Sequence, residues 1–373
     1  MELIVMALIL SAVLFGQYLL YAKLGLKNVS YKLSVSTPEA FEGDEIEITE
    51  EIENAKWLPL PWIRTEISCS RRLSFKGQAQ SADKTEQRGL VSSIFVLKGY
   101  QKCRRVWKVR CEKRGVFTVY DSALSVSDLF GLAKPAMVIK LGQSVRVLPV
   151  PADMEAGELS DEAFIGDIQV RRFVLPDPFM ICGAKEYTGR EPMNRIHWAQ
   201  TARTGTLMAY NNEFTTERRV LVILNMQRTY SDERQKLSVS KLEAQIKAAA
   251  FLLDLCYKSR TEVGIIANSA EPLSIEPSSG YEHTMTSLRA LAELKNGCGE
   301  HIDDFISRQE LGGYTDIVFI SSFLSEKSAE ILRGLSLAGK SCAIFTTDIE
   351  ETDFCEVRHI PQVRYYPNEG GED

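Results

Sequence analysis

The residues best suited to chemistry lie in one short basic and aromatic segment. Arg195, His197, Trp198 and Arg203 fall close together, directly after the Arg190-Glu191 pair. A histidine beside a carboxylate and a guanidinium group has the composition of a general-base site. No nucleophile motif accompanies it, because the chain lacks the Gly-x-Ser-x-Gly elbow of serine hydrolases. We therefore expect no catalytic residue, and an enzyme using Arg190, Glu191 and His197 is the weakest alternative.

Two non-catalytic interpretations of this segment remain. In the first, Tyr187, Glu191 and Glu213 pair the arginines, and the segment braces the domains through a buried Trp198 and a buried ion pair of Arg203. In the second, the same aromatic and basic side chains are exposed and dock a partner protein. We favour the brace.

Other reactive groups show no pattern of a site. The eight cysteines are scattered without a Cys-x-x-Cys pair, which indicates buried thiols in a reducing compartment rather than zinc ligands or disulfides. The glycine pairs lack the Gly-x-x-x-x-Gly-Lys context of a phosphate-binding loop. The formal net charge of -6 arises from interspersed acidic and basic residues, so nucleic acid is not an expected partner. We expect no cofactor.

Two kinds of domain must position these residues. Short runs with alternating polarity fill residues 29–150, among them DEIEITEEIE and RVWKVRC, and turn residues separate them. Period two with frequent turns predicts an all-β immunoglobulin-like sandwich. Residues 151–185 lose this periodicity and contain Pro176 and Pro178, so we interpret them as a connector.

The pattern changes class in residues 186–373. Continuous apolar runs such as VLVILN and VGIIAN alternate with amphipathic stretches such as LEAQIKAAAFLLDLCYK. Buried parallel strands that alternate with helices predict a doubly wound α/β domain.

The first 28 residues predict a membrane anchor and a juxtamembrane segment. Residues 3–22 form an uncharged apolar run whose helical length is about the ~30 Å of a bilayer's hydrocarbon core. Lys23, Lys27 and Lys32 follow the run, whereas only Glu2 precedes it. The positive-inside rule therefore predicts a single-pass protein of the cell membrane with a cytoplasmic body. A cleaved signal peptide is the alternative, but the basic n-region that it requires is missing.

The segment 186–225 resembles the signature of the bacterial "domain of unknown function 58" family. The residues on that pattern, in order, include Tyr187, Arg195, Ile196, His197, Trp198, Ala202, Arg203, Leu207 and Glu213, with Glu191 in the acidic position. The upstream run KRGVFTVYDSALSVSDLFGL is similar to the element that closes the β-sandwich in that family. The resemblance implies a membrane-anchored β-sandwich followed by a von Willebrand factor A-like domain.

The resemblance also implies a magnesium site that has degenerated here. An intact von Willebrand A fold places Asp-x-Ser-x-Ser after its first strand and a ligand aspartate after a later strand. The corresponding positions are Asn225, Gln227 and Thr229, and then Ser321 and Ser322. None of them is a carboxylate, and neutral side chains alone seldom hold magnesium, so we expect no bound metal.

For function, the resemblance implies an adaptor rather than an enzyme. Members of this family are often encoded beside a MoxR-type AAA+ ATPase, which makes such an ATPase the expected partner in chaperone-like or envelope-related assembly. The main alternative is an outward-facing, metal-dependent adhesion module. The sequence does not identify the client, the oligomeric state or the cellular process.

Overall fold

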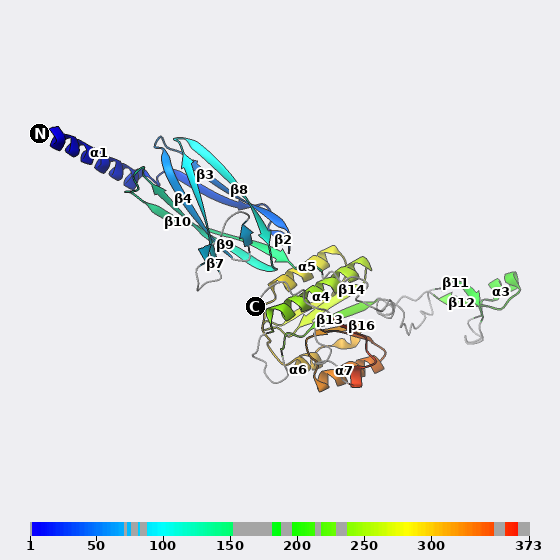
Figure 1. Ribbon diagram of the computed structural model, residues 1–373. Coiled ribbons are helices and arrows are strands. Elements are labelled where there is room, and N and C mark those ends of the chain that lie inside the picture. Colours follow the sequence, from blue (N-terminus) through cyan, green and yellow to red (C-terminus); the bar gives the residue numbers. More distant parts are fainter. Residues whose placement is uncertain are drawn as a thin grey trace. The chain divides into compact units, whose positions relative to one another are not determined.

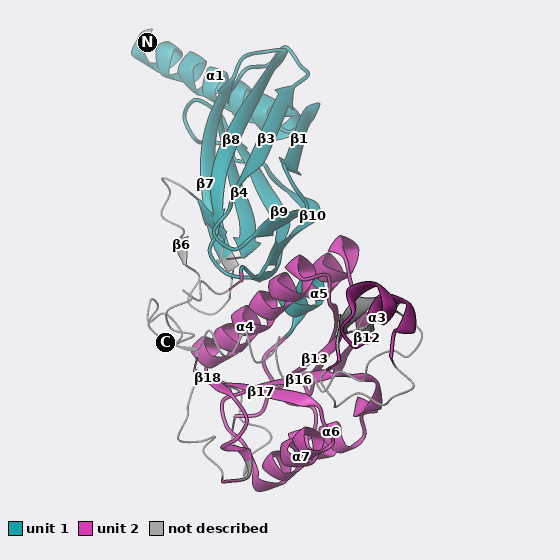
Figure 2. Cartoon of the chain, turned by 90° about the vertical axis from the view of Figure 1, so that its right-hand side faces the viewer, with its two compact units in different colours: residues 1–150, 288–294 teal, residues 151–287, 295–373 magenta. Residues whose placement is uncertain are grey.

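A computed structural model describes residues 2–70, 73–75, 81–82, 88–151, 181–187, 196–212, 218–228, 237–346 and 355–364. The chain divides into two compact units, one of residues 1–150 with 288–294 and one of residues 151–287 with 295–373 (Figures 1 and 2). The first unit contains a long helix and a β-sandwich. The second contains an α/β sheet and a small hairpin.

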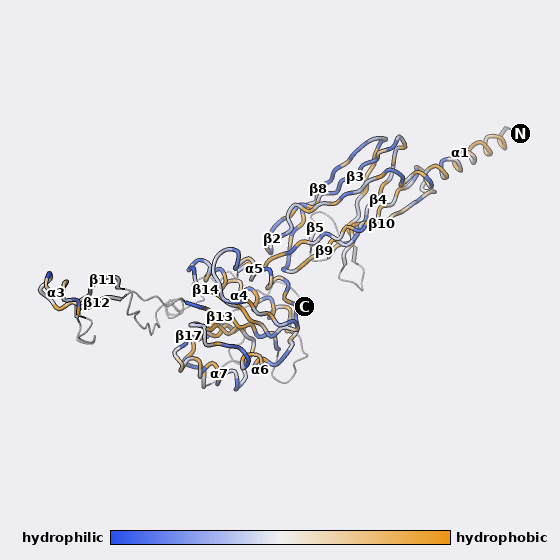
Figure 3. Tube along the Cα trace, turned by 180° about the vertical axis from the view of Figure 1, so that it is seen from behind, coloured by the Kyte–Doolittle hydropathy of each residue, from blue (hydrophilic) through white to orange (hydrophobic). Residues whose placement is uncertain are grey.

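The N-terminal helix α1 (Glu2–Leu24) is the most apolar element of the chain (Figure 3). Its residues Leu3–Leu24 have a mean hydropathy of 2.4, and their best window is not buried in the protein. A helix of this length and composition is able to span a bilayer, as the sequence predicted.

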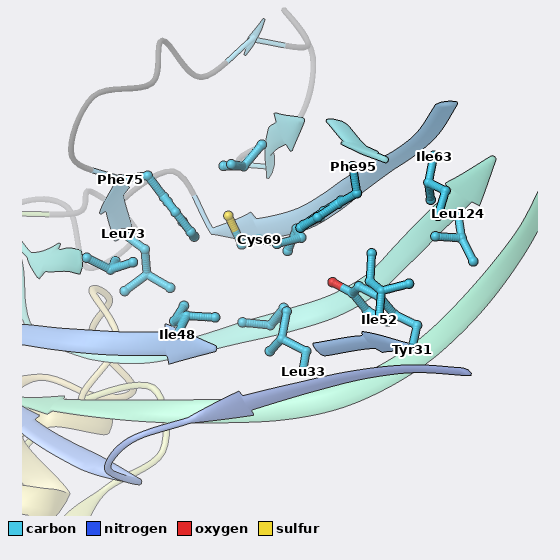
Figure 4. Packing of buried hydrophobic residues seen from close by; sticks show 14 of the residues in the cluster. Tyr31, Leu33, Ile48, Ile52, Ile63, Cys69, Leu73, Phe75, Phe95 and Leu124 are labelled. Atoms are coloured by element: carbon cyan, nitrogen blue, oxygen red, sulfur yellow. The ribbon is translucent and has the colours of Figure 1, made fainter. Parts of the chain in front are cut away.

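The strands of the first unit form two sheets around one core (Figure 4). The four-stranded sheet has the order β1 (Val29–Val35), β3 (Glu45–Asn54), β8 (Gln101–Cys111) and β5 (Leu73–Phe75). The six-stranded sheet has the order β2 (Glu39–Phe41), β10 (Ala136–Leu148), β9 (Gly115–Ser127), β4 (Leu60–Ser70), β7 (Arg88–Leu97) and β6 (Ser81–Ala82). All pairs are antiparallel except β2 with β10. A two-sheet sandwich therefore follows the helix.

The alternation of β3 explains both its apolar face and one unexpected charge. Ile46, Ile48 and Ile52 point into the core, and the same period of two turns Glu50 inward as well. Glu50 is fully buried and accepts hydrogen bonds from four neutral donors, two from each sheet: Tyr31 Oη (2.9 Å) and Trp107 Nε1 (2.6 Å), and Thr65 Oγ1 and Ser93 Oγ (both 3.1 Å). The carboxylate thus joins the two sheets across the core.

Helix α1 and the sandwich share one core. Tyr21 is buried among the sandwich residues and donates from Oη to Pro59 O (3.0 Å), while Leu20 and Leu24 pack against the same cluster. Lys56 donates to Gly25 O (2.9 Å) and Lys27 O (2.8 Å) just beyond the helix. The last turn of the apolar run therefore packs against the β-sandwich. The predicted boundary at residue 29 divides side chains that share this core.

The second unit is built on a six-stranded sheet. Its order is β15 (Leu273–Ser278), β14 (Glu262–Ala267), β13 (Arg219–Leu224), β16 (Asp316–Ser321), β17 (Ser341–Thr346) and β18 (Gln362–Arg364). All neighbours are parallel except β15, which is antiparallel to β14. The central strands are buried along their whole length, as strands covered on both faces must be.

Helices cover both faces of this sheet. Helix α4 (Val239–Lys258) lies on one face, and α6 (Ile302–Ser307) and α7 (Glu326–Leu337) lie on the other (Figures 1 and 2). Helix α5 (Tyr281–Glu293) follows β15, and short 3-10 turns occur at Leu311–Gly313 and Cys355–Val357. The predicted α/β region with a doubly wound sheet is confirmed at this level.

The signature segment forms a small element of its own. Strands β11 (Ile181–Glu186) and β12 (Met208–Asn212) pair antiparallel, and helix α3 (Trp198–Thr204) lies between them in the chain. Strand β11 begins inside the stretch 151–185 that the sequence predicted as an irregular connector. Residues 152–180 lie outside the described part of the chain.

Candidate functional site

The candidate site lies at the carboxyl edge of the parallel sheet. In the sheet, β14 and β15 lie on one side of β13, and β16, β17 and β18 lie on the other side. The strand order therefore reverses between β13 and β16. Ligand sites of open α/β sheets form at such a switch point. Asn225 directly follows β13, and Ser321 and Ser322 lie at the end of the neighbouring β16. The structure therefore brings together two of the predicted metal-site regions.

The side chains at this edge are hydrogen-bonded to one another. Asn225 Nδ2 donates to Ser321 Oγ (2.9 Å), and Asn225 Oδ1 accepts from Gln227 N (3.0 Å). Asn268, which follows β14, accepts from Met226 N through Oδ1 (2.7 Å) and donates to Glu300 O (3.1 Å). All of these amide and hydroxyl side chains are buried. They tie together the ends of three adjacent strands.

Helix α4 adds a fourth amide to this edge. With its amide oriented to meet complementary groups, Gln245 donates to Asn225 O (3.0 Å) and accepts from Ser322 N (3.2 Å). The Ser322 hydroxyl is buried and has no hydrogen-bond partner among the described residues. The backbone at the switch point is thus held by a side chain from the helix layer.

A second chain of contacts leads from the edge to the start of α7. Gln227 lies 3.3 Å from His301 between Nε2 atoms, and its Oε1 accepts from Ile302 N (3.2 Å). His301 Nδ1 lies 3.6 Å from Asp303 Oδ2. The buried Asp303 accepts through Oδ1 from the hydroxyls of Ser325, the N-cap of α7, and Ser328. This carboxylate is therefore stabilised by hydroxyl donors at a helix N-terminus.

This arrangement does not fit a magnesium ion. Divalent hard cations need several oxygen ligands, usually including carboxylates. Asn225 directs an amide N–H at Ser321, and the Asp303 oxygen nearest α7 is already shared by two hydroxyls. Within the described ranges, no three His, Cys, Asp or Glu side chains are placed to share a metal. Thr229, the remaining predicted metal-site position, lies outside these ranges.

Histidine 197 has a local structural role. It is the N-cap of α3, its Nδ1 accepts from Gln200 N (3.2 Å), and its backbone N donates to Met208 O (2.7 Å). The lone pair of this ring nitrogen is thus engaged in capping the helix. Tyr187 N donates to Leu207 O (2.8 Å), which extends the strand pairing beyond Glu186 and Met208. Both residues therefore hold the hairpin together.

The expected burial of Trp198 is wrong. Its side chain is 65% exposed, Arg203 is also exposed, and helix α3 has no buried residue. Trp198 is the first residue of a short helix whose contacts to the hairpin are made by its backbone and small polar residues. The indole is therefore exposed to solvent. Glu191, Arg195 and Glu213, which the brace also required, lie outside the described residues, as does Arg190 of the enzyme alternative.

Sequence reasoning missed several members of the polar network, although signals for two were present. Asn268 ends VGIIAN as Asn225 ends VLVILN, and parallel strands bring such ends to the same edge. Gln245 lies one helical turn from Leu242 and Ala249, on the buried face of α4. His301 and Asp303 carried no comparable signal, because the loop before α6 has no periodicity and α6 itself has only six residues.

Known proteins resemble this chain in part. Three solved structures are similar: a non-cellulosomal cohesin from the archaeon Archaeoglobus fulgidus (15% identity, 36% of this chain and 99% of that chain, TM-score 0.21), the CARDB domain of PF1109 from Pyrococcus furiosus (8%, 33% and 90%, 0.20) and a beta-glucosidase from Listeria innocua (11%, 32% and 16%, 0.18). No functional inference follows from TM-scores this low. No curated protein matches the chain.

A family match covers most of the second unit. Residues 184–360, which include the hairpin, the switch point and strands β13 to β17, match the family described as "Protein of unknown function DUF58". This is the family whose signature the segment 186–225 resembles. Residues 184–360 of the chain therefore belong to the DUF58 family.

Proposed function

We propose that this chain is a non-enzymatic, membrane-anchored adaptor that binds a partner protein through the exposed face of α3. The observation that carries the proposal is the exposed Trp198 with Arg203 on the same short helix. Tryptophan and arginine are the residue types most enriched in binding hot spots. A large exposed aromatic on a soluble element is stabilised by a partner rather than by water.

The polar switch point supports the same function. Its amides and hydroxyls bond to one another and to backbone groups of the same edge, which stiffens the sheet edge and leaves few groups to act on a substrate. The strand order with an antiparallel third strand supports a von Willebrand A-like interpretation of the domain, with a degenerate metal site. Family resemblance makes a MoxR-type AAA+ ATPase the partner that we propose.

A pull-down from native membranes tests this function. The full chain serves as bait, with and without ATP, beside Trp198→Ala and the control Tyr281→Ala. Tyr281 is a similarly exposed aromatic of the second unit on helix α5. We expect Trp198→Ala alone to lose the ATPase. Equal recovery by Trp198→Ala and the parent would refute docking through α3.

A further inference from the structure

The end of the sandwich that receives α1 carries a group of exposed apolar side chains. Four segments meet there, namely residues 25–28, 55–62, 98–100 and 128–135, which we call the helix-end collar. Lys56 bonds to Gly25 O and Lys27 O, and its own carbonyl accepts from Tyr100 N (3.0 Å). A Cβ built on Gly25 would lie 3.1 Å from Pro135 Cγ. The collar therefore surrounds the point where the helix leaves the sandwich.

The collar exposes more large apolar surface than a soluble sandwich requires. Its exposed members have relative exposures of 52–75%: Trp57, Trp62, Tyr100, Leu129, Phe130 and Leu132. At the opposite end, Phe41, Val116 and Val150 are the large apolar residues exposed among those described, at 38%, 47% and 36%. Contiguous exposed apolar groups mark an interaction site, and tryptophan and tyrosine are enriched at membrane interfaces.

The exposed charges of the collar have one sign. Its four segments contain Lys27, Lys56, Lys98 and Lys134, and Asp128 is their one acidic residue. Asp128 and Lys56 are buried, so the exposed charges of the collar are lysines. Aromatic side chains mixed with exposed lysines match the headgroup layer of a bilayer with anionic lipid.

The length of α1 brings the collar to the bilayer. Because Tyr21 is buried in the sandwich core and Leu20 packs against it, the part of the helix free to cross the membrane is residues 3–19. At 1.5 Å per residue this stretch is about 26 Å long, slightly less than the ~30 Å hydrocarbon core. No linker separates it from the sandwich. A fully inserted helix therefore draws the collar into the headgroup region.

We propose that the helix-end collar is a membrane-interface surface, on which Trp57, Trp62, Tyr100 and the Leu129-Phe130 turn insert among lipid headgroups. The collar and α1 together hold the sandwich in a fixed orientation on the bilayer. This inference rests on the membrane anchoring in the proposed function. It assigns to the first unit a second lipid contact besides the helix.

The test uses the native tryptophans of the full chain in proteoliposomes. The lipids are a phosphatidylcholine and phosphatidylglycerol mixture, with bromine atoms either near the headgroup or near the chain end. We expect headgroup-proximal bromines to quench the fluorescence most, and Trp57→Phe and Trp62→Phe each to remove part of that quenching. Trp198→Phe, which alters an exposed tryptophan of the second unit, is the matched control and should change none of it.

Each other outcome overturns the inference in a distinguishable way. Release of the protein by alkaline carbonate would contradict both the membrane anchoring and this inference. If the protein remains membrane-integrated but bromine does not quench its fluorescence, the lipid contact of the collar is refuted and the membrane anchoring still stands. Quenching that survives both collar substitutions, or that Trp198→Phe abolishes, would place the lipid contact elsewhere. Protection of Trp57 from aqueous acrylamide without bromine quenching would assign the collar to a protein partner.

Discussion

Replacing Asn225 with alanine should destabilise the second unit alone. The substitution removes the donor to Ser321 Oγ and the acceptor for Gln227 N, and it leaves that buried N–H without its side-chain partner. An unsatisfied buried donor costs about 1–3 kcal/mol, and the lost hydrogen bond to Ser321 adds about 1 kcal/mol. We therefore expect a loss of about 2–4 kcal/mol in the free energy of unfolding.

Buried thiols allow this loss to be measured unit by unit. Cys256 and Cys342 lie in the second unit, and burial raises the pKa values of their thiols to about 11 and about 12. They react with a thiol reagent only when the unit opens. A loss of 2–4 kcal/mol should raise their labelling rate on the order of 30- to 1,000-fold.

Two controls make the result decisive. Cys69 and Cys111 report the first unit, where burial raises their thiol pKa values to about 12 and about 11. Their labelling rates should not change in Asn225→Ala. The second control, Ser274→Ala on the exposed face of β15, should change the free energy of unfolding by no more than about ±0.5 kcal/mol, so all four labelling rates should stay close to those of the parent. Unchanged labelling of Cys256 and Cys342 in Asn225→Ala would falsify the stabilising role of the network.

The remaining predictions concern both units. Glu50→Leu should cost at least about 3 kcal/mol because it removes the acceptor of three buried donors and of the half-buried Trp107 indole. Glu50→Gln keeps an acceptor and should cost about 1–2 kcal/mol, and both losses are measured by Cys69 labelling. Trp198→Ala should change the free energy of unfolding by less than about 0.5 kcal/mol in a thermal melt, and a larger loss would support the brace interpretation instead. Millimolar magnesium should not shift the melting temperature, although a site filled at about 100 times its dissociation constant would add ~2.7 kcal/mol. For topology, Cys355 is exposed, so an impermeant maleimide should miss it in intact cells if the body is cytoplasmic, and labelling would reverse the orientation.

The sequence predicted the elements whose patterns are local. The uncharged run at the N-terminus, the alternation before residue 150 and the apolar strands after it each correspond to elements of the structure. A hydropathy window cannot separate lipid from protein core, so it included Tyr21 in the membrane span although that ring packs in the sandwich. The burial of a side chain at the end of such a run depends on tertiary contacts.

Glu50 shows how composition can hide a periodic signal. The run EIEITEEIEN reads as a strand with an acidic solvent face, and a glutamate in it is expected outside. Period two nevertheless places residue 50 on the face of Ile48 and Ile52, and the structure follows the period. The donors that make this burial tolerable come from four other strands, which local sequence does not reveal.

The signature segment could not be assigned to a brace or a docking surface from its residue types, because both require the same aromatic and basic side chains. The exposure of Trp198 separates the two interpretations physically. Loss of a buried aromatic lowers stability, and with it every function of the unit, whereas loss of an exposed one changes binding alone. Asn225→Ala and Trp198→Ala therefore form a complementary pair. Asn225→Ala should lower the stability of the second unit, whereas Trp198→Ala should lower partner recovery from a fully folded chain. A loss of partner binding that tracks stability across both variants would mean that α3 contributes no contact of its own.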